Sequence, residues 1–329
     1  MTRKIILDTD PGIDDAMAIL FAQASPILEL KALTTVYGNT DIEHGTNNAL
    51  FLKNKYHLCA DIVKGASLPL SGIPKAPVVK VHGQTGFGHI KVSPQSHTNL
   101  DKRSAAQYII DSVNAEPNEI TLIAVGPLTN LALALQLEPQ ISTLVKEVII
   151  MGGAFGLNDH RGNVTPYAEA NIHADPLAAD IVFAANWPIT VIGLDVTKET
   201  LFTEEYLKDI KNNTEEVGQF IWDISQYYLE FYRQITGSKS CHVHDPSAIA
   251  YAISPELFSF REGPIHVITS GPAKGHTLQK FDNIPYMNDP WSERRSHQVG
   301  ASVNSDTLLT LYKNTLLDYD KTLSSQDEK

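Results

Sequence analysis

Four carboxylates fall within eight residues near the start of the chain, in the segment DTDPGIDDA that covers residues 8–16. The segment directly follows apolar residues 5–7, which are typical of a buried strand. Carboxylates this close repel one another, and a bound cation relieves that repulsion. Ligands that are all oxygen favour a hard cation, calcium or magnesium. The alternative is an acidic helix N-terminus, which the helix dipole stabilises and which suits Asp14 best.

Two common oxygen-rich or phosphate-binding motifs do not fit this segment. An EF-hand loop places its glycine one residue later than Gly12, and a helix rather than a strand precedes it. A phosphate-binding Walker loop requires a Gly-Lys-Ser or Gly-Lys-Thr sequence, which does not follow. The segment therefore predicts a cation site of another type.

Short apolar runs alternate with helical patterns along the chain. Strands are expected at residues 4–7, 28–36, 120–125, 147–150 and 189–193, and helices at 14–23, 42–55, 128–137 and 176–185. This alternation predicts an α/β fold with a Rossmann-like, mostly parallel central sheet flanked by helices. Ligands of such sheets bind outside the carboxyl ends of the strands. We therefore expect the chemistry just after Leu7, Val36, Val125 and Ile150.

The composition is that of an ordinary globular protein of 329 residues, with 43% hydrophobic residues and a formal charge of −12. We expect a single domain over residues 1–319 and a disordered polar tail at 320–329. The negative charge excludes a nucleic-acid-binding surface. No signal peptide and no membrane-spanning run is apparent, so we expect a cytoplasmic protein. Residues 65–99 are rich in Gly, Pro, His and Ser and predict a long functional loop.

The segment DTDPGIDDA resembles the N-terminal signature of the nucleoside hydrolase family. Further motifs follow in the family's order: VYGNT (36–40), HG (82–83), VGPLTN (125–130), MGGA (151–154), GNVTP (162–166), EANI (169–172) and HDP (244–246). Phe87 departs from the pattern, because a smaller aliphatic residue is expected there. The resemblance spans residues 5–250 and is weaker over the last 75 or so. It implies the nucleoside hydrolase fold and hydrolysis of ribonucleosides to ribose and free base.

The resemblance also implies one calcium ion per subunit, held by Asp10, Asp15, the backbone carbonyl of Val125, and Asp245. With a bidentate Asp15, two ribose hydroxyls and one water, the shell reaches about eight oxygens, which calcium accepts and magnesium does not. Calcium acidifies bound water less than zinc does, so a general base is still needed. Asp10 is the expected base that activates the attacking water.

Other family motifs imply contacts to the sugar. By resemblance, Asp14 binds the 2′-hydroxyl, Asn39 orients water and ribose, Asn163 and Glu169 bind the 5′-hydroxyl, and Asn171 lies at the 3′-hydroxyl. Cleavage passes through an oxocarbenium-like state, and nearby carboxylates stabilise its positive charge. The catalytic and ribose-binding residues are thus expected to share one negative site.

The leaving base needs a proton or hydrogen-bond donors, which histidine can supply near neutral pH. Of the 12 histidines, His244 precedes the expected metal ligand Asp245, and His82 lies in the Gly-rich loop. We expect both to bind the substrate and assist the leaving base, with Tyr232 lining the base pocket. His244 favours a broad or inosine-uridine and pyrimidine preference, although the nucleobase itself is not readable from the sequence. Relatives of this type are commonly homodimers or homotetramers, so we expect a homo-oligomer.

Two other functions are open. In a haloacid dehalogenase-type phosphatase, Asp8 would be the nucleophile and Asp10 the acid, but Gly12 stands where that family requires Thr or Val. A non-catalytic nucleoside-binding protein would keep the ribose ligands and lose the base or the acid. Because Asp10, Asn39 and His244 are all present, the sequence favours the enzyme.

Overall fold

A central sheet organises the computed structural model, which describes residues 2–282 and 284–327. In this part of the chain the sheet has nine strands in the order β10-β13-β7-β6-β5-β1-β2-β3-β4. Neighbours pair in parallel except β10 and β13, which are antiparallel. The strands are β1 (Arg3–Thr9), β2 (Leu28–Thr35), β3 (Asp61–Lys64), β4 (Leu100–Asp101), β5 (Ile120–Ala124), β6 (Glu147–Met151), β7 (Ile189–Ile192), β10 (Phe258–Gly263) and β13 (His297–Val303). The expected mostly parallel α/β sheet is confirmed.

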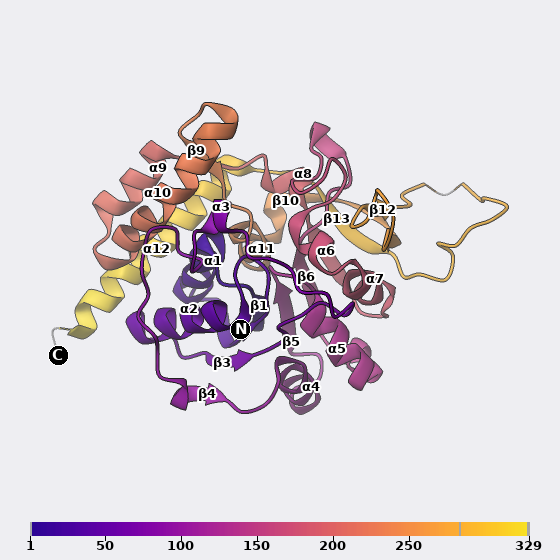
Figure 1. The fold of residues 1–329 in the computed structure, drawn as a ribbon, viewed down its shortest axis with the longest axis horizontal. Helices are drawn as coiled ribbons and strands as arrows, with labels where there is room; N and C mark the ends of the chain where they lie inside the picture. The colour runs from indigo at the N-terminus through magenta and orange to yellow at the C-terminus, as the bar shows by residue number, and fades with distance from the viewer. Residues whose placement is uncertain (1, 283, 328–329) are drawn as a thin grey trace.

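Helices cover both faces of the sheet (Figure 1). One face packs against α1 (Ile13–Ala24), α2 (Ile42–Lys55), α10 (Glu216–Thr236), α11 (Pro246–Ile253) and α12 (Ser305–Asp327). The other packs against α4 (Ala105–Ala115), α5 (Thr129–Leu137) and α7 (Pro176–Ala184). The remaining α-helices and strands are α3 (Val79–His82), α6 (Ala170–Ala174), α8 (Leu194–Thr197), α9 (Glu204–Asn213), β8 (Leu201–Thr203), β9 (Ser240–His242), β11 (Ile265–Val267) and β12 (Thr277–Gln279). The result is a three-layer sandwich.

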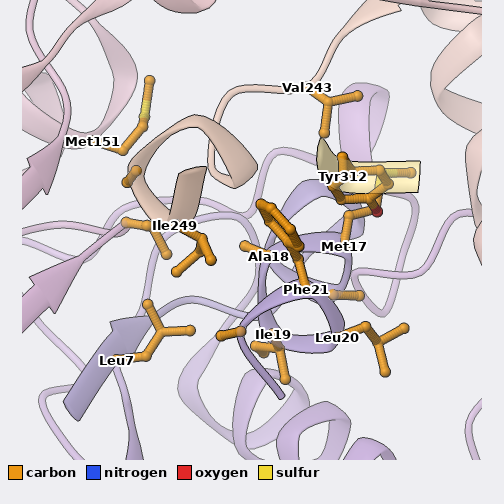
Figure 2. Packing of buried hydrophobic residues seen from close by; sticks show 14 of the residues in the cluster. Leu7, Met17, Ala18, Ile19, Leu20, Phe21, Met151, Val243, Ile249 and Tyr312 are labelled. Carbon is orange, nitrogen blue, oxygen red and sulfur yellow. The ribbon is translucent and has the colours of Figure 1, made fainter. Parts of the chain in front are cut away.

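The alternation of side chains along β1 creates two cores. Ile5 and Leu7 join the core beneath α1, whereas Ile6 joins the core on the opposite face. Figure 2 shows Leu7 facing the apolar side of α1, with Ile249 of α11 close by. Each fully buried side chain of this size contributes about 1.5–3 kcal/mol to folding. The first strand and first helix, which carry the acidic segment between them, are therefore held rigidly.

Most of the expected elements appear within a residue or two of their predicted ends. Helix α2 covers residues 42–55 as predicted. Residues 65–99 form the expected long loop, interrupted by the single turn of α3 and by a 3₁₀ turn at His97–Asn99. The antiparallel edge pair of β10 and β13 was not foreseen, because the motif pattern weakens in that part of the chain.

The C-terminal segment differs from the expectation of a disordered tail over residues 320–329. Helix α12 continues through Asp327, and residues 328–329 lie outside the described part. Asp320 is buried and accepts hydrogen bonds from the backbone N–H groups of Glu215, at 2.6 Å, and Val217. It thereby caps the start of α10.

No helix in residues 2–282 and 284–327 combines the length and apolarity needed to cross a membrane.

Candidate active site

A cavity of about 260 Å³ opens at the carboxyl ends of β1, β2, β5 and β6. Side chains that follow these strands line it, among them Asp14, Asn39, Val125 and Met151. The chain positions that the strand-end rule selected therefore do meet at one site. Asn171 from α6 and Asp245 from the start of α11 complete this side of the cavity.

Asp15 is fixed at the N-terminus of α1. Its carboxylate accepts hydrogen bonds from the Thr9 hydroxyl at 2.6 Å, the Asn39 amide at 2.8 Å and the Gly12 backbone N–H at 3.0 Å. The side chain is fully buried. These donors favour the ionised carboxylate and hold it in one position.

Asp10 has one bound and one free carboxylate oxygen. Oδ2 accepts the backbone N–H of Asn39 at 2.6 Å. Oδ1 is buried and has no hydrogen-bond partner among the described residues. A Cβ atom added at Gly38 would lie 1.9 Å from Oδ2, and one at Gly126 would lie 2.7 Å from Oδ1. Gly38 of the VYGNT motif and Gly126 of the VGPLTN motif thus leave room for the Asp10 carboxylate.

Three carboxylates form a close group: Asp14, Asp15 and Asp245 each offer an oxygen within 4.8 Å of the others. All three are buried, and Asp14 Oδ1 lacks a hydrogen-bond partner among the described residues. Asp10 lies beside this group rather than in it. The Val125 carbonyl accepts a hydrogen bond from the Asn171 side chain at 2.8 Å.

Burial and mutual repulsion disfavour ionisation of these acids. Burial first, and then the charge of Asp15, raises the pKa of Asp14 to about 7. The same two causes raise the pKa of Asp10 well above its usual range. Burial, followed by the charge of Asp14, does so for Asp245. Buried carboxylates with unpartnered oxygens are a donor set that fits a hard divalent cation, which would reverse these shifts.

The expected sugar-binding side chains lie on the wall beside this cluster. Glu169 caps α6 and accepts backbone N–H groups from Asn171 at 2.9 Å and Gly153 at 3.0 Å. The Asn171 side chain also bonds to the Met151 carbonyl. Asn163 lies at the exposed rim of the cavity. The three residues expected to hold the 3′- and 5′-hydroxyls therefore share one wall.

His82 reaches the cavity from α3 and is locked in one neutral form. Its Nδ1 accepts the backbone N–H of Ile13 at 3.2 Å. Burial lowers the pKa of His82 to about 3, so the imidazole is neutral near pH 7. With Nδ1 accepting, the single proton of the ring resides on Nε2. His82 can therefore donate one hydrogen bond into the cavity.

His244 stands on the same cavity, directly before Asp245. Its Nδ1 lies 2.7 Å from the Thr197 hydroxyl, and its Nε2 lies 3.4 Å from the Tyr232 hydroxyl. Burial, together with the nearby His242, lowers the pKa of His244 well below its usual range. The ring thus bridges two hydroxyls and faces the aromatic wall of α10.

Helix α10 supplies that wall, and Tyr232, which was expected to line the base pocket, does lie on this cavity. Tyr228 and Phe231 line it as well, and Tyr228 donates a hydrogen bond to Asp14 at 3.4 Å. Tyr228 and Phe231 were not among the site residues expected from the sequence. The spacing of four residues, which places Tyr228 and Tyr232 on one helix face, was the available signal. Lys75, which also lines the cavity, was missed too.

Asp8, by contrast, lies apart from the cavity lining. Its Oδ1 accepts the Thr34 hydroxyl at 2.6 Å and the Asn130 amide at 2.7 Å, and the side chain is buried. A nucleophile needs access to its substrate. The geometry therefore argues against the phosphatase alternative.

Comparisons with known proteins show what the whole chain resembles. The sequence profile described as "Inosine-uridine preferring nucleoside hydrolase" matches residues 5–310. The chain is 40% identical over 279 residues to the inosine-uridine preferring nucleoside hydrolase of Leishmania major, covering 82% of this chain and 85% of that protein. A plant nucleoside hydrolase structure superposes with a TM-score of 0.92 at 36% identity, covering 96% of this chain and 99% of that one. A purine-preferring ribonucleoside hydrolase from Gardnerella vaginalis superposes with a TM-score of 0.88 at 33% identity, covering 97% and 100%.

Proposed function

Because the chain belongs to the inosine-uridine preferring nucleoside hydrolase family, a family of N-glycosidases, we propose that it cleaves the N-glycosidic bond of ribonucleosides by the residues described above. The observation that carries the proposal is the convergence of distant segments on one cavity. The acidic segment after β1, Asn39 after β2, Glu169 and Asn171 at α6, and His244-Asp245 before α11 all meet there. The products would be ribose and a free base.

We propose calcium as the cofactor, held by Asp10, Asp15, the Val125 carbonyl and Asp245, with Asp14 close enough to share the site. The unpartnered oxygens of Asp10 and Asp14 and the mutual repulsion of the acids support this assignment. When bound, calcium would orient a water molecule and the vicinal diol of ribose, which predicts a preference for ribose over deoxyribose.

Asp10 is the proposed general base. The Asn39 backbone N–H occupies its Oδ2, which leaves the buried Oδ1 to take a proton from the attacking water. The Asn39 side chain is bound to Asp15, so its own position is fixed. Attack occurs at the anomeric carbon, and the carbon–nitrogen bond to the base breaks as positive charge develops on the ribose.

The surrounding carboxylates stabilise that developing charge. Asp14 is proposed to bind the 2′-hydroxyl, Asn163 and Glu169 the 5′-hydroxyl, and Asn171 the 3′-hydroxyl. Glu169 and Asn171 are fixed by backbone hydrogen bonds before substrate arrives, so little reorganisation is needed. A negative site that is already ordered binds an oxocarbenium-like state better than the neutral substrate.

The leaving base is proposed to be stabilised by His82 and His244. His82 would donate its Nε2 proton as a hydrogen bond, because Nδ1 is occupied by Ile13. His244 would hydrogen-bond to the base through Nε2, beside the Tyr232 hydroxyl. A pair of neutral donors suits a base that departs with extra electron density.

The direct test is a panel of ribonucleosides assayed for free ribose and free base, with and without a calcium chelator. The proposal predicts stoichiometric ribose and base, and loss of both when calcium is removed. Phosphate release from phosphomonoesters would instead support the phosphatase. Tight nucleoside binding without ribose release would support a binding protein.

Base preference and assembly remain predictions. The relatives differ in their named substrates, which include uridine, inosine and purine nucleosides. We expect a broad or inosine-uridine and pyrimidine preference for this chain, on the strength of His244. We also expect a homodimer or homotetramer, which sedimentation of the purified protein would reveal.

A further inference from the structure

Lys75 brings a positive charge into a cavity otherwise dominated by carboxylates. It lines the cavity together with Glu169 and Asn163, and it is partly buried. Within residues 2–282 and 284–327 its ammonium makes no direct hydrogen bond or ion pair. The carboxylates that attract it from a greater distance are Asp10 and Glu169, while burial lowers the pKa of Lys75. An ammonium with three N–H donors is therefore available in the cavity that Glu169 also lines, within electrostatic reach of Asp10 and Glu169.

The segment that carries Lys75 is anchored to the rest of the molecule by a backbone hydrogen bond at each end. The Leu70 backbone N–H bonds to Asp175 at 2.8 Å, and the Val78 N–H bonds to the Asn39 carbonyl at 2.9 Å. Between these anchors, the hydrogen bonds within the described part of the chain are local turns only. Lys75 lies in the sequence Pro-Lys-Ala-Pro, and proline favours a stiff extended backbone. The segment thus presents the lysine to the cavity with little conformational freedom to lose.

The proposed sugar contacts leave the 5′-oxygen of the ribose without a buried hydrogen-bond donor, and the Lys75 ammonium can supply one. A 5′-hydroxyl both donates and accepts hydrogen bonds, whereas a carboxylate such as Glu169 only accepts. The Glu169 oxygens are already held by backbone N–H groups of Gly153, Asn171 and Ile172. A hydroxyl that donates to Glu169 would still need a donor for its own oxygen. Asn163 lies at the exposed rim, where water competes for its amide.

We propose that Lys75 is a substrate-binding residue that donates a hydrogen bond to the 5′-oxygen of the ribose, opposite Glu169. The inference rests on the proposed ribonucleoside hydrolysis and adds a cationic contact on the loop to that function. Because Lys75 lies within residues 71–77, the affinity for the 5′-hydroxyl of the ribose would depend on where this part of the loop lies. The 5′-hydroxyl would then be bound by Glu169 at the start of α6 and by Lys75 on the loop.

The test pairs a change in the enzyme with a change in the substrate. Lys75→Gln, Lys75→Arg and a control, Lys80→Gln, are assayed on uridine and on 5′-deoxyuridine. Lys80 is exposed on the same loop and does not line the cavity. K75Q should lower kcat/KM for uridine about 10- to 100-fold, the loss expected for one charged hydrogen bond. It should leave kcat/KM for 5′-deoxyuridine nearly unchanged, and K75R should recover part of the uridine activity.

Equal losses on the two substrates would overturn the contact, because they would show a general electrostatic or folding role for Lys75. A K75Q variant that behaves like K80Q, in an enzyme that releases ribose normally, would also overturn it and leave the proposed function intact. If the wild-type chain released no ribose from any ribonucleoside, the proposed function would fail. Calorimetric binding of uridine and 5′-deoxyuridine to wild type and K75Q would then still decide the Lys75 contact: only uridine should lose affinity.

Discussion

The cavity has two ends that are built from different parts of the fold. At the acidic end, Asp14 and Asp245 line the cavity, and Asp10 and Asp15 lie next to them, held by backbone hydrogen bonds. The opposite end consists of His82 from the long loop, His244, and the Tyr228, Phe231 and Tyr232 side chains of α10. Under the proposed function, chemistry on the sugar would thus depend on the sheet. Recognition of the base would depend on side-chain packing, which can vary while the sheet stays the same.

The two ends also differ in electrostatics. Burial raises the pKa of the acids at one end and lowers the pKa of the histidines at the other. Both groups are driven toward neutrality by the same low-dielectric surroundings. A cation restores charge to the acids, whereas the histidines remain neutral hydrogen-bonding groups. The substitutions below should therefore separate attack on the sugar from departure of the base.

The largest effect is expected at the acidic end. Asp10→Asn should lower kcat about 100- to 10,000-fold, because an amide cannot take the proton of the attacking water. Ribose release under saturating substrate measures this. Asp159→Asn, a change at an exposed loop position, is the matched control. Turnover by D10N within tenfold of wild type would rule out Asp10 as the base.

At the base end, His244→Gln and His82→Gln should each lower kcat on uridine about 100- to 1,000-fold, as removal of a transition-state donor does. A riboside with a good leaving group, such as p-nitrophenyl riboside, should be cleaved at nearly the wild-type rate, since it needs no assistance. His242→Gln, next to His244 but outside the cavity lining, is the control. Equal losses on both substrates would place the histidines in sugar binding instead.

The substrate itself can sharpen the comparison. Replacing uridine by 2′-deoxyuridine removes a hydroxyl from the acidic end and leaves the base end untouched. We expect kcat/KM to fall about 10- to 100-fold, through loss of the proposed contact to Asp14 and of a calcium ligand. Competition between the two nucleosides in one reaction measures the ratio directly. Equal rates on both sugars would contradict the proposed role of the 2′-hydroxyl in binding Asp14 and calcium.

The smallest effect expected is on stability. The pKa of Asp14 is raised from its ordinary 3.8 to about 7, so the folded chain without calcium binds protons more tightly than the unfolded chain. Its stability should therefore fall as pH rises between these values, by about 5 °C in Tm. Calcium should restore stability most at the upper end of that range, because it binds the ionised acids. A metal-free Tm that rises between pH 4 and 7 would contradict the assignment.

The same contrast explains how much of the molecule could be predicted from its sequence. The strand-end rule located the residues after β1, β2, β5 and β6, because the backbone of a parallel sheet determines where they lie. Lys75 was missed, since no periodic pattern tells whether a loop lysine faces a cavity. Tyr228 was missed although its spacing of four residues from Tyr232 was available as a signal. The continuation of α12 through Asp327 was missed because its support comes from a distant contact, between Asp320 and the start of α10.

The most direct test of the central claim is to strip the protein of metal and titrate it with calcium while ribose release from uridine is followed. We predict that the metal-free protein releases no ribose, and that activity rises linearly with added calcium and levels off at one calcium ion per chain. Full ribose release in excess chelator, or none at any calcium concentration, would contradict it.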